Sequence, residues 1–167
     1  VKHNAILLTN FEASNNLTFE IYNDGASKRV TANDALSTGV WMHLAVSMDN
    51  AGNVIIYKDG IQIHSGTTLL PAVIDRPSSF IGRSNWGWDG FLDGSIMETA
   101  VWNSALTANE VTALYNSGSG LDASSNSGNY ISSSSLVNYW KFNEGTGSTI
   151  NDASSSSNNG AINGASW

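Results

Sequence analysis

The residues best suited to ligand chemistry lie close together in Ser84-Asn85-Trp86-Gly87-Trp88-Asp89. Sugars bind to proteins by stacking on aromatic rings and by hydrogen bonding to amide and carboxylate groups, and this stretch contains all of these. Gly87 separates the two indoles and leaves them free to point apart. Each indole could instead fill the end of a hydrophobic core. The sequence predicts a ligand site formed by Asn85, Trp86, Trp88 and Asp89.

The same acidic loop is a candidate for calcium binding. Calcium takes carboxylate and backbone oxygens as ligands, and loops rich in aspartate, glycine and asparagine supply both. Asp89 and Asp93 lie on either side of Gly90-Phe91-Leu92, and Glu144 and Asp152 are candidates outside the loop. No stretch matches an EF-hand loop. We predict a structural calcium ion with Asp89 and Asp93 among its ligands.

Known catalytic arrangements are missing from the sequence. His3, His43 and His64 are not spaced as metal ligands, no nucleophile elbow occurs, and there is no cysteine. Glycoside hydrolysis requires two carboxyl groups roughly 5–10 Å apart. Asp93 and Glu98 are five positions apart, so a regular strand would place them on opposite faces. We predict a protein without enzymatic activity, with a glycoside hydrolase using Asp93 and Glu98 as the less favoured alternative.

The composition favours β structure and excludes some partners. Of 167 residues, 25 are serine, 20 asparagine and 16 glycine, residue types that suit turns. The net charge is −7, and the seven lysines and arginines are too scattered to form a basic stripe for nucleic acid. No apolar run approaches the ~20 residues that span a bilayer, so we expect no membrane insertion. The sequence begins at Val1 without a signal peptide, which suggests a processed or excised piece.

The strongest local signal is a β-hairpin around Asp59-Gly60, because both central residues of such a turn need positive φ. Counting outward from a two-residue turn pairs position 58 with 61, 57 with 62 and 56 with 63. This register predicts a core-facing row formed by Val54, Ile56, Ile61 and Ile63.

Other strands are predicted at intervals of about eight to twelve residues, a spacing typical of sandwiches and barrels. They cover residues 6–9, 17–22, 28–31, 41–48, 80–82, 91–102 and 136–142. One helix is predicted after Thr107, because Thr107 and Glu110 form a capping-box pattern, and Gly118 is its expected end. Residues 117–135 include 14 serines, glycines or asparagines among 19, so we expect a polar connecting arm that packs no core.

An ordered set of stretches resembles laminin-G-like modules of the concanavalin A-like superfamily, in their bacterial and phage form. The set comprises residues 41–46, 56–60, 80–83, 91–96 and 101–115. The resemblance implies an all-β, two-sheet antiparallel jelly-roll sandwich with one short helix, often with a structural calcium ion and often binding glycans. At Met97-Glu98 the family commonly carries two acids, so this departure puts a calcium ligand there in doubt.

Residues 136–167 resemble the strands that usually open such a module, yet they stand at the end of this chain. One interpretation is a circularly permuted module, in which residues 1–167 form a single sandwich completed by 136–167. The other is that residues 136–167 begin a further repeat. We favour completion, because a sandwich without its opening strands would expose sheet edges.

The sequence therefore predicts an extracellular, non-catalytic binding module at a cell or virion surface. Its expected ligand is a glycan or a cell-surface polysaccharide, as in a lectin or an adhesion protein. The alternative is a structural domain of a virion or surface assembly, such as a phage capsid decoration or fibre. Such a domain would act through contacts with neighbouring copies, and the low charge and the polar arm at residues 117–135 suit it.

Overall fold

The structure is a computed structural model that describes residues 4–10 and 14–167. Its strands are β1 (Ala5–Asn10), β2 (Leu17–Asn23), β3 (Ala26–Ala32), β4 (Leu44–Met48), β5 (Asn53–Lys58), β6 (Ile61–Thr67), β7 (Thr99–Trp102), β8 (Leu136–Trp140), β9 (Thr149–Ile150) and β10 (Gly160–Ala161). The helix α1 covers Ala108–Tyr115, and short 3-10 turns cover Asn116–Gly118 and Ser133–Ser135. Within the described ranges, no helix has the length and apolar character needed to cross a membrane.

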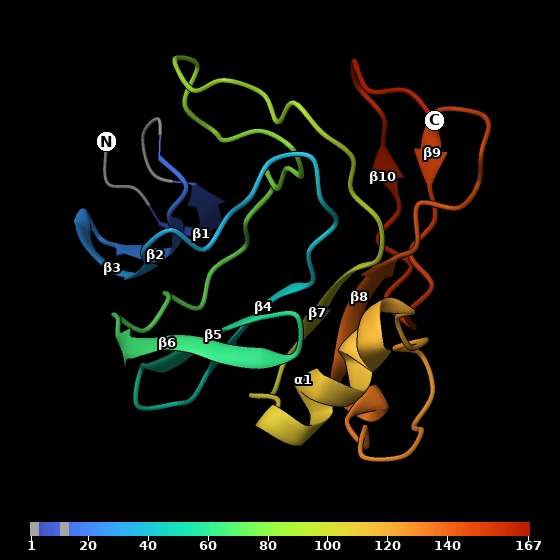
Figure 1. Ribbon diagram of the computed structural model, residues 1–167. Coiled ribbons are helices and arrows are strands. Elements are labelled where there is room, and N and C mark those ends of the chain that lie inside the picture. The colour runs from blue at the N-terminus through green and yellow to red at the C-terminus, as the bar shows by residue number, and fades with distance from the viewer. Residues whose placement is uncertain (1–3, 11–13) are drawn as a thin grey trace.

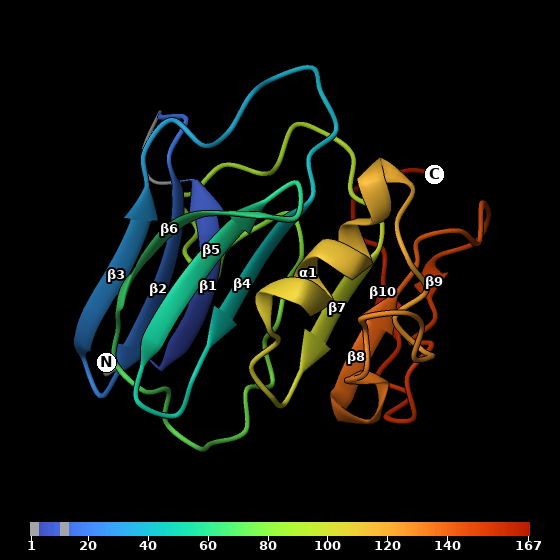
Figure 2. The ribbon, with the colours of Figure 1, turned by 60° about the horizontal axis from the view of Figure 1, so that its bottom comes forward.

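Two three-stranded antiparallel sheets form one end of the molecule. β1, β2 and β3 pair in that order, and so do β4, β5 and β6. Figures 1 and 2 show the two sheets stacked on each other, with β6 alongside β3. Gly66 of β6 allows this approach, since a Cβ there would lie 3.0 Å from a methyl group of Val30. The predicted all-β antiparallel sandwich with one short helix is confirmed.

Apolar side chains from both sheets fill the space between them. The nearly inaccessible members on the strands are Leu17, Phe19, Ile21, Val30, Ala32, Val54 and Ile56. Burying a large aliphatic or aromatic side chain contributes ~1.5–3 kcal/mol relative to leaving it exposed, so this cluster stabilises the stacking of the sheets. Polar groups on the other face of β2 are also covered and find partners: Glu20 forms an ion pair with Arg29 at 3.2 Å.

The β5–β6 hairpin turns at Asp59-Gly60 as predicted, with φ of 52° and 75° at the two residues. Lys58 pairs with Ile61, as expected from a two-residue turn. A β-bulge then shifts the register, so that Ile56 pairs with His64, whereas the prediction paired it with Ile63. The turn is therefore confirmed, whereas the register beyond it is displaced by one residue.

The predicted core-facing row is only half correct. Val54 and Ile56 are fully buried, but the side chains of Ile61 and Ile63 are 69% and 39% exposed. A bulge adds one residue to β6 and interrupts the alternation of its side chains, which removes Ile63 from the face that carries Ile56. Ile61 borders the turn and stays largely in solvent.

A long loop, residues 68–98, connects β6 to β7 and is coloured green to olive in Figure 1. The strand predicted at residues 80–82 does not form, and of the strand predicted at 91–102 only β7 does. Positive φ values at Gly82 (80°) and Glu98 (54°) interrupt the extended backbone on either side of this region. β4 likewise begins at Leu44, three residues later than predicted.

The helix α1 begins with the predicted capping box. Thr107 Oγ1 accepts a hydrogen bond from Glu110 N at 3.3 Å, and Glu110 Oε2 accepts one from Thr107 N at 2.9 Å. The helix ends at Tyr115, and the left-handed φ of 46° at the C-cap Asn116 stops it two residues before the predicted Gly118. Thr112 Oγ1 donates to the carbonyl of Gly60 at 2.8 Å, so α1 is docked on the hairpin turn.

At the other end of the molecule β8 pairs antiparallel with β7, and a second hydrophobic cluster surrounds them. Its buried members are Leu114 of α1, Tyr139 of β8, and Ala123 and Tyr130 from residues 117–135. The expectation that residues 117–135 pack no core is therefore wrong. The Tyr130 hydroxyl donates to Ala123 O at 2.8 Å and accepts from Trp102 Nε1 at 2.9 Å, so the phenol is buried without an unpaired polar atom.

Asp152 attaches the end of the chain to β8. Its buried carboxylate accepts hydrogen bonds of 2.8–3.0 Å from the amides of Tyr139, Ser154 and Asn158 and from Asn138 Nδ2. Burial opposes ionisation, but these hydrogen bonds prevail and hold the pKa of Asp152 well below its usual range. β9 and β10, which precede and follow Asp152 in the sequence, pair with each other.

Candidate functional site

The predicted ligand loop, residues 84–89, is a compact turn closed by its own hydrogen bonds. Ser84 Oγ donates to Asp89 Oδ2 at 2.5 Å and accepts from Trp86 N at 3.0 Å. The amide of Asp89 donates to Trp86 O at 3.2 Å. The loop thus has a defined shape before a ligand arrives, which reduces the entropy that binding must overcome.

The two tryptophans of this loop have different surroundings. Trp86 is half-buried, and its ring centroid lies 5.6 Å from that of Tyr22 on β2 at an angle of 49°. Trp88 is 83% exposed. Trp86 therefore fixes the loop to the sheet, whereas Trp88 presents its indole to solvent, where a sugar ring could stack on it.

Asn85 lines a pocket of about 280 Å³ between the start of β1 and residues 74–85. Ile6 and Phe80 give the pocket apolar surface, and Arg83 adds a positive charge. The Arg83 guanidinium lies 4.5 Å from the ring centroid of Phe80 and 5.8 Å from that of Phe91, within cation–π range. The pocket was not predicted, since it depends on the long loop lying beside β1.

The predicted calcium ligands are close in sequence but do not form a cluster of acids. Asp89 already accepts the hydroxyl of Ser84. Among the described residues, no three His, Cys, Asp or Glu side chains lie together in a way that could hold a metal ion. Of the outside candidates, Asp152 has its lone pairs occupied by four donors, and one oxygen of Glu144 accepts from Asn151 N at 2.7 Å. The calcium site stays a prediction.

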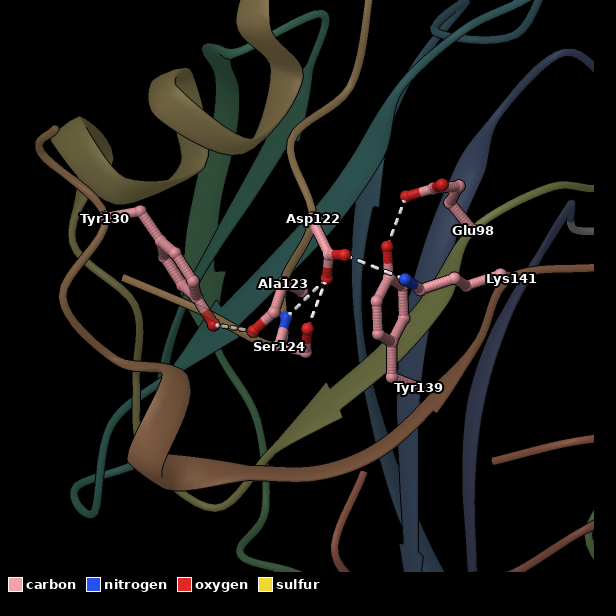
Figure 3. Close-up of polar contacts among 7 residues, drawn as sticks. All are labelled: Glu98, Asp122, Ala123, Ser124, Tyr130, Tyr139 and Lys141. Atoms are coloured by element: carbon pink, nitrogen blue, oxygen red, sulfur yellow. Dashed lines mark hydrogen bonds and ion pairs between the residues drawn. The ribbon is translucent and has the colours of Figure 1, made fainter. Parts of the chain in front are cut away.

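The carboxylates considered for hydrolysis, Asp93 and Glu98, are both exposed. Glu98 accepts a hydrogen bond of 2.6 Å from the hydroxyl of Tyr139, as Figure 3 shows. Burial of Tyr139 and its hydrogen bond to Glu98 both raise the pKa of the phenol, which therefore stays a proton donor in this pair. Glu98 thus has a structural partner on β8.

An ion pair completes the network drawn in Figure 3. Lys141 Nζ lies 2.8 Å from Asp122 Oδ2 and 5.2 Å from the ring centroid of Tyr139. Hydrogen bonds from Lys141 and Ser124 lower the pKa of Asp122 to about 2. The ion pair joins residues 117–135 to Lys141, the residue that follows β8. The surroundings of Asp122 resemble those of Asp152, because Ser124 N donates to Asp122 Oδ1 at 2.9 Å and Ser154 N donates to Asp152 Oδ1 at the same distance. These contacts hold together segments that are distant in the sequence, and we assign them a structural role.

The two stacked antiparallel sheets define a β-sandwich protein. A laminin G family model, described as the concanavalin A-like lectin/glucanases superfamily, matches residues 2–112. That range covers most of the chain, and the chain belongs to this family. The resemblance expected from the sequence is confirmed.

Two solved structures are similar to the chain. A proposed carbohydrate-binding protein from Bacteroides ovatus is 28% identical with a TM-score of 0.57, over 88% of this chain and 40% of that protein. An S-layer domain-containing protein from Clostridium thermocellum is 25% identical with a TM-score of 0.44, over 60% of this chain and 51% of that one. This chain thus spans about half or less of each neighbour. No curated protein matches it.

Proposed function

We propose that this chain is a non-catalytic, extracellular module that binds carbohydrate through the loop at residues 84–89. The observation that carries the proposal is Trp88, an indole 83% exposed on a loop closed by hydrogen bonds. An indole that is open to solvent on a loop of defined shape offers a flat apolar face on which a sugar ring can stack. Asn85 and Asp89 supply hydrogen-bonding groups for sugar hydroxyls on either side of it.

The similarity to a proposed carbohydrate-binding protein supports the same ligand class. The absence of catalysis is proposed from the carboxylates. Glu98 is engaged by the Tyr139 hydroxyl, and Asp93 makes no hydrogen bond to another described residue. Neither arrangement resembles an acid held in an apolar pocket, which a general acid at neutral pH requires.

A glycan array followed by titration calorimetry tests the proposal. Trp88→Ala should weaken binding of the best glycan at least tenfold, because a stacked indole contributes about 1.4 kcal/mol or more. The matched control is Trp41→Ala, which removes an indole that is also exposed (65%) but lies outside the loop. Binding that is unaffected by Trp88→Ala, or no binding to any glycan class, would contradict the proposal.

Calcium is proposed as a structural ion of this site. Its ligands would be Asp89 and Asp93, together with backbone carbonyl oxygens of the loop. Calorimetric titration of the chelator-treated protein with calcium chloride measures it directly. Asp93→Asn should weaken the uptake, whereas Asp75→Asn, an exposed acid elsewhere on the long loop, should not. Absence of heat on titration would refute the site.

The second candidate function is assembly by protein–protein contact. β1 is an edge strand, and its residues Ile6 and Leu8 pair with the buried Ile21 and Phe19, yet both are about half exposed. An edge with apolar side chains is a template for pairing with another strand. Light scattering that shows an oligomer, dispersed by Ile6→Lys, would favour assembly, whereas a monomer at all concentrations would exclude it.

A further inference from the structure

We propose that the pocket beside β1 makes the module selective for acidic sugars, with Arg83 as the residue that binds the sugar carboxylate. The inference rests on the proposed carbohydrate binding and assigns the chemical class of the ligand. The pocket lies next to the loop that carries Trp88, because Asn85 belongs to both. The proposal therefore places one sugar of the glycan on Trp88 and a neighbouring sugar in the pocket.

The charge of the pocket is opposite to that of the chain. The protein carries a net charge of −7, with only seven lysines and arginines. Two of those cations, Arg76 and Arg83, line this one pocket, and Asp75 is the acid among its lining residues. Neither arginine forms an ion pair with a carboxylate of the described residues within 4.0 Å. With two arginines and one aspartate, the lining carries a net charge of +1, whereas the chain as a whole carries −7.

The Arg83 side chain is held in place but keeps its outer nitrogens available. Its Nε donates to Ser84 O at 3.1 Å, and its guanidinium lies over Phe80 and near Phe91. No hydrogen bond from the two Nη groups to a described residue occurs. A guanidinium positioned by aromatic rings and with its outer edge open matches a carboxylate, which it binds through two parallel hydrogen bonds.

Arg76 contributes positive charge to the pocket, while its hydrogen bond serves the loop. Its Nη2 donates to Ala72 O at 2.8 Å, and its Nε is buried with no partner among the described residues. The side chain therefore supports the loop from within and adds to the positive potential of the pocket. In a cavity partly removed from water, this potential favours an anionic group more strongly than it would at an open surface.

The rest of the lining favours a sugar over an acidic peptide as the source of the carboxylate. Ser78, Ser79 and Asn85 supply hydroxyl and amide groups for sugar hydroxyls, and Ile6 and Phe80 supply apolar surface for the C–H groups of a ring. A volume of about 280 Å³ is near the lower end of small-molecule sites and accommodates a single ring-sized group. A uronic acid residue within an oligosaccharide combines all these features.

The experiment compares trigalacturonate with the same trisaccharide after reduction of its carboxyl groups, by calorimetry in 0.15 M salt with a chelator present. The acidic oligosaccharide should bind at least tenfold more tightly, because a charge-assisted pair changes affinity by roughly ten- to a hundredfold. Arg83→Gln should abolish most of this preference, and Arg83→Lys should retain part of it. Lys28→Gln, which removes one positive charge on β3, should leave it unchanged. Arg83 is exposed, so its variants should unfold like the parent.

Equal binding of the two oligosaccharides, still weakened by Trp88→Ala, would overturn the acidic selectivity and leave the proposed function intact. A preference that survives Arg83→Gln would likewise overturn the role of Arg83. No binding of either probe, together with a silent glycan array, would refute both. Tetraglutamate binding as tightly as trigalacturonate would show a carboxylate site for peptides, against a sugar-specific pocket.

Discussion

Asp152→Asn should destabilise the whole protein by about 3 kcal/mol or more. The carboxylate is 8% exposed and accepts four hydrogen bonds, two at each oxygen. Asparagine keeps one acceptor oxygen, but its NH₂ group replaces the other oxygen and cannot accept a hydrogen bond. Two donors therefore lose their acceptor. Hydrogen bonds to a charged acceptor contribute ~1.5–3 kcal/mol each, so the loss of two gives the stated magnitude.

Urea unfolding of the parent and the variant at pH 7, followed by both fluorescence and circular dichroism, measures this effect. Asp122→Asn is the matched control, because Asp122 stands in the same Asp-Ala-Ser-Ser context but is half-exposed and paired with Lys141, an arrangement that contributes ~1 kcal/mol or less. An Asp152→Asn variant within 1 kcal/mol of the parent would refute the anchoring role. Two separate unfolding transitions in the parent would show that the segment folds independently of the sandwich.

Three further predictions concern the fold. Gly60→Ala should lower the free energy of unfolding by about 1–3 kcal/mol, because φ there is 75° and a Cβ would lie 3.0 Å from a side-chain carbon of Tyr115 in α1. Its control is Gly25→Ala, where φ is 87° but the space is open, so only the backbone strain should be lost. The midpoints of urea unfolding compare the two variants. Ile56→Ala should cost ~2–5 kcal/mol and Ile61→Ala under 1 kcal/mol in the same assay, and equal losses would contradict the exposed position of Ile61. The pKa of Asp152 in the folded protein lies below its ordinary value of 3.8. The stabilisation of the fold by this carboxylate is therefore complete above pH 3.8 and is lost as the pH falls through the folded pKa. In an acid titration, the free energy of unfolding of Asp152→Asn should fall less steeply with pH than that of the parent.

The sequence predicted those elements that depend on residues close together in the chain. The turn at Asp59-Gly60 depends on backbone preferences of two adjacent residues, and the capping box on Thr107 and Glu110 three positions apart. Both are present in the structure. The register beyond the turn was wrong at Ile63, because a bulge depends on how β6 meets the other sheet and leaves no mark in the hydrophobic alternation.

Long-range packing decided the features that the sequence did not predict. Tyr130 stands in a run of serines, glycines and asparagines, and its burial depends on Trp102 and on the strand pairing that brings β8 to β7. For the ligand loop, residue types indicated the chemistry. Which indole faces solvent depends on Tyr22, a partner distant in sequence. The pocket at Arg83 likewise exists because the long loop lies against β1.

The pairing of β8 with β7 also indicates where the chain could be cut without separating its two parts. Residues 124–129 are all exposed and lie between Ala123 and Tyr130, which are both buried in the second cluster. A single cut in this stretch would separate two polypeptides that still share a strand pair and a hydrophobic cluster. We expect the molecule to be reconstituted from two separately expressed fragments of unequal length, as in a split reporter whose signal returns only when both fragments bind each other.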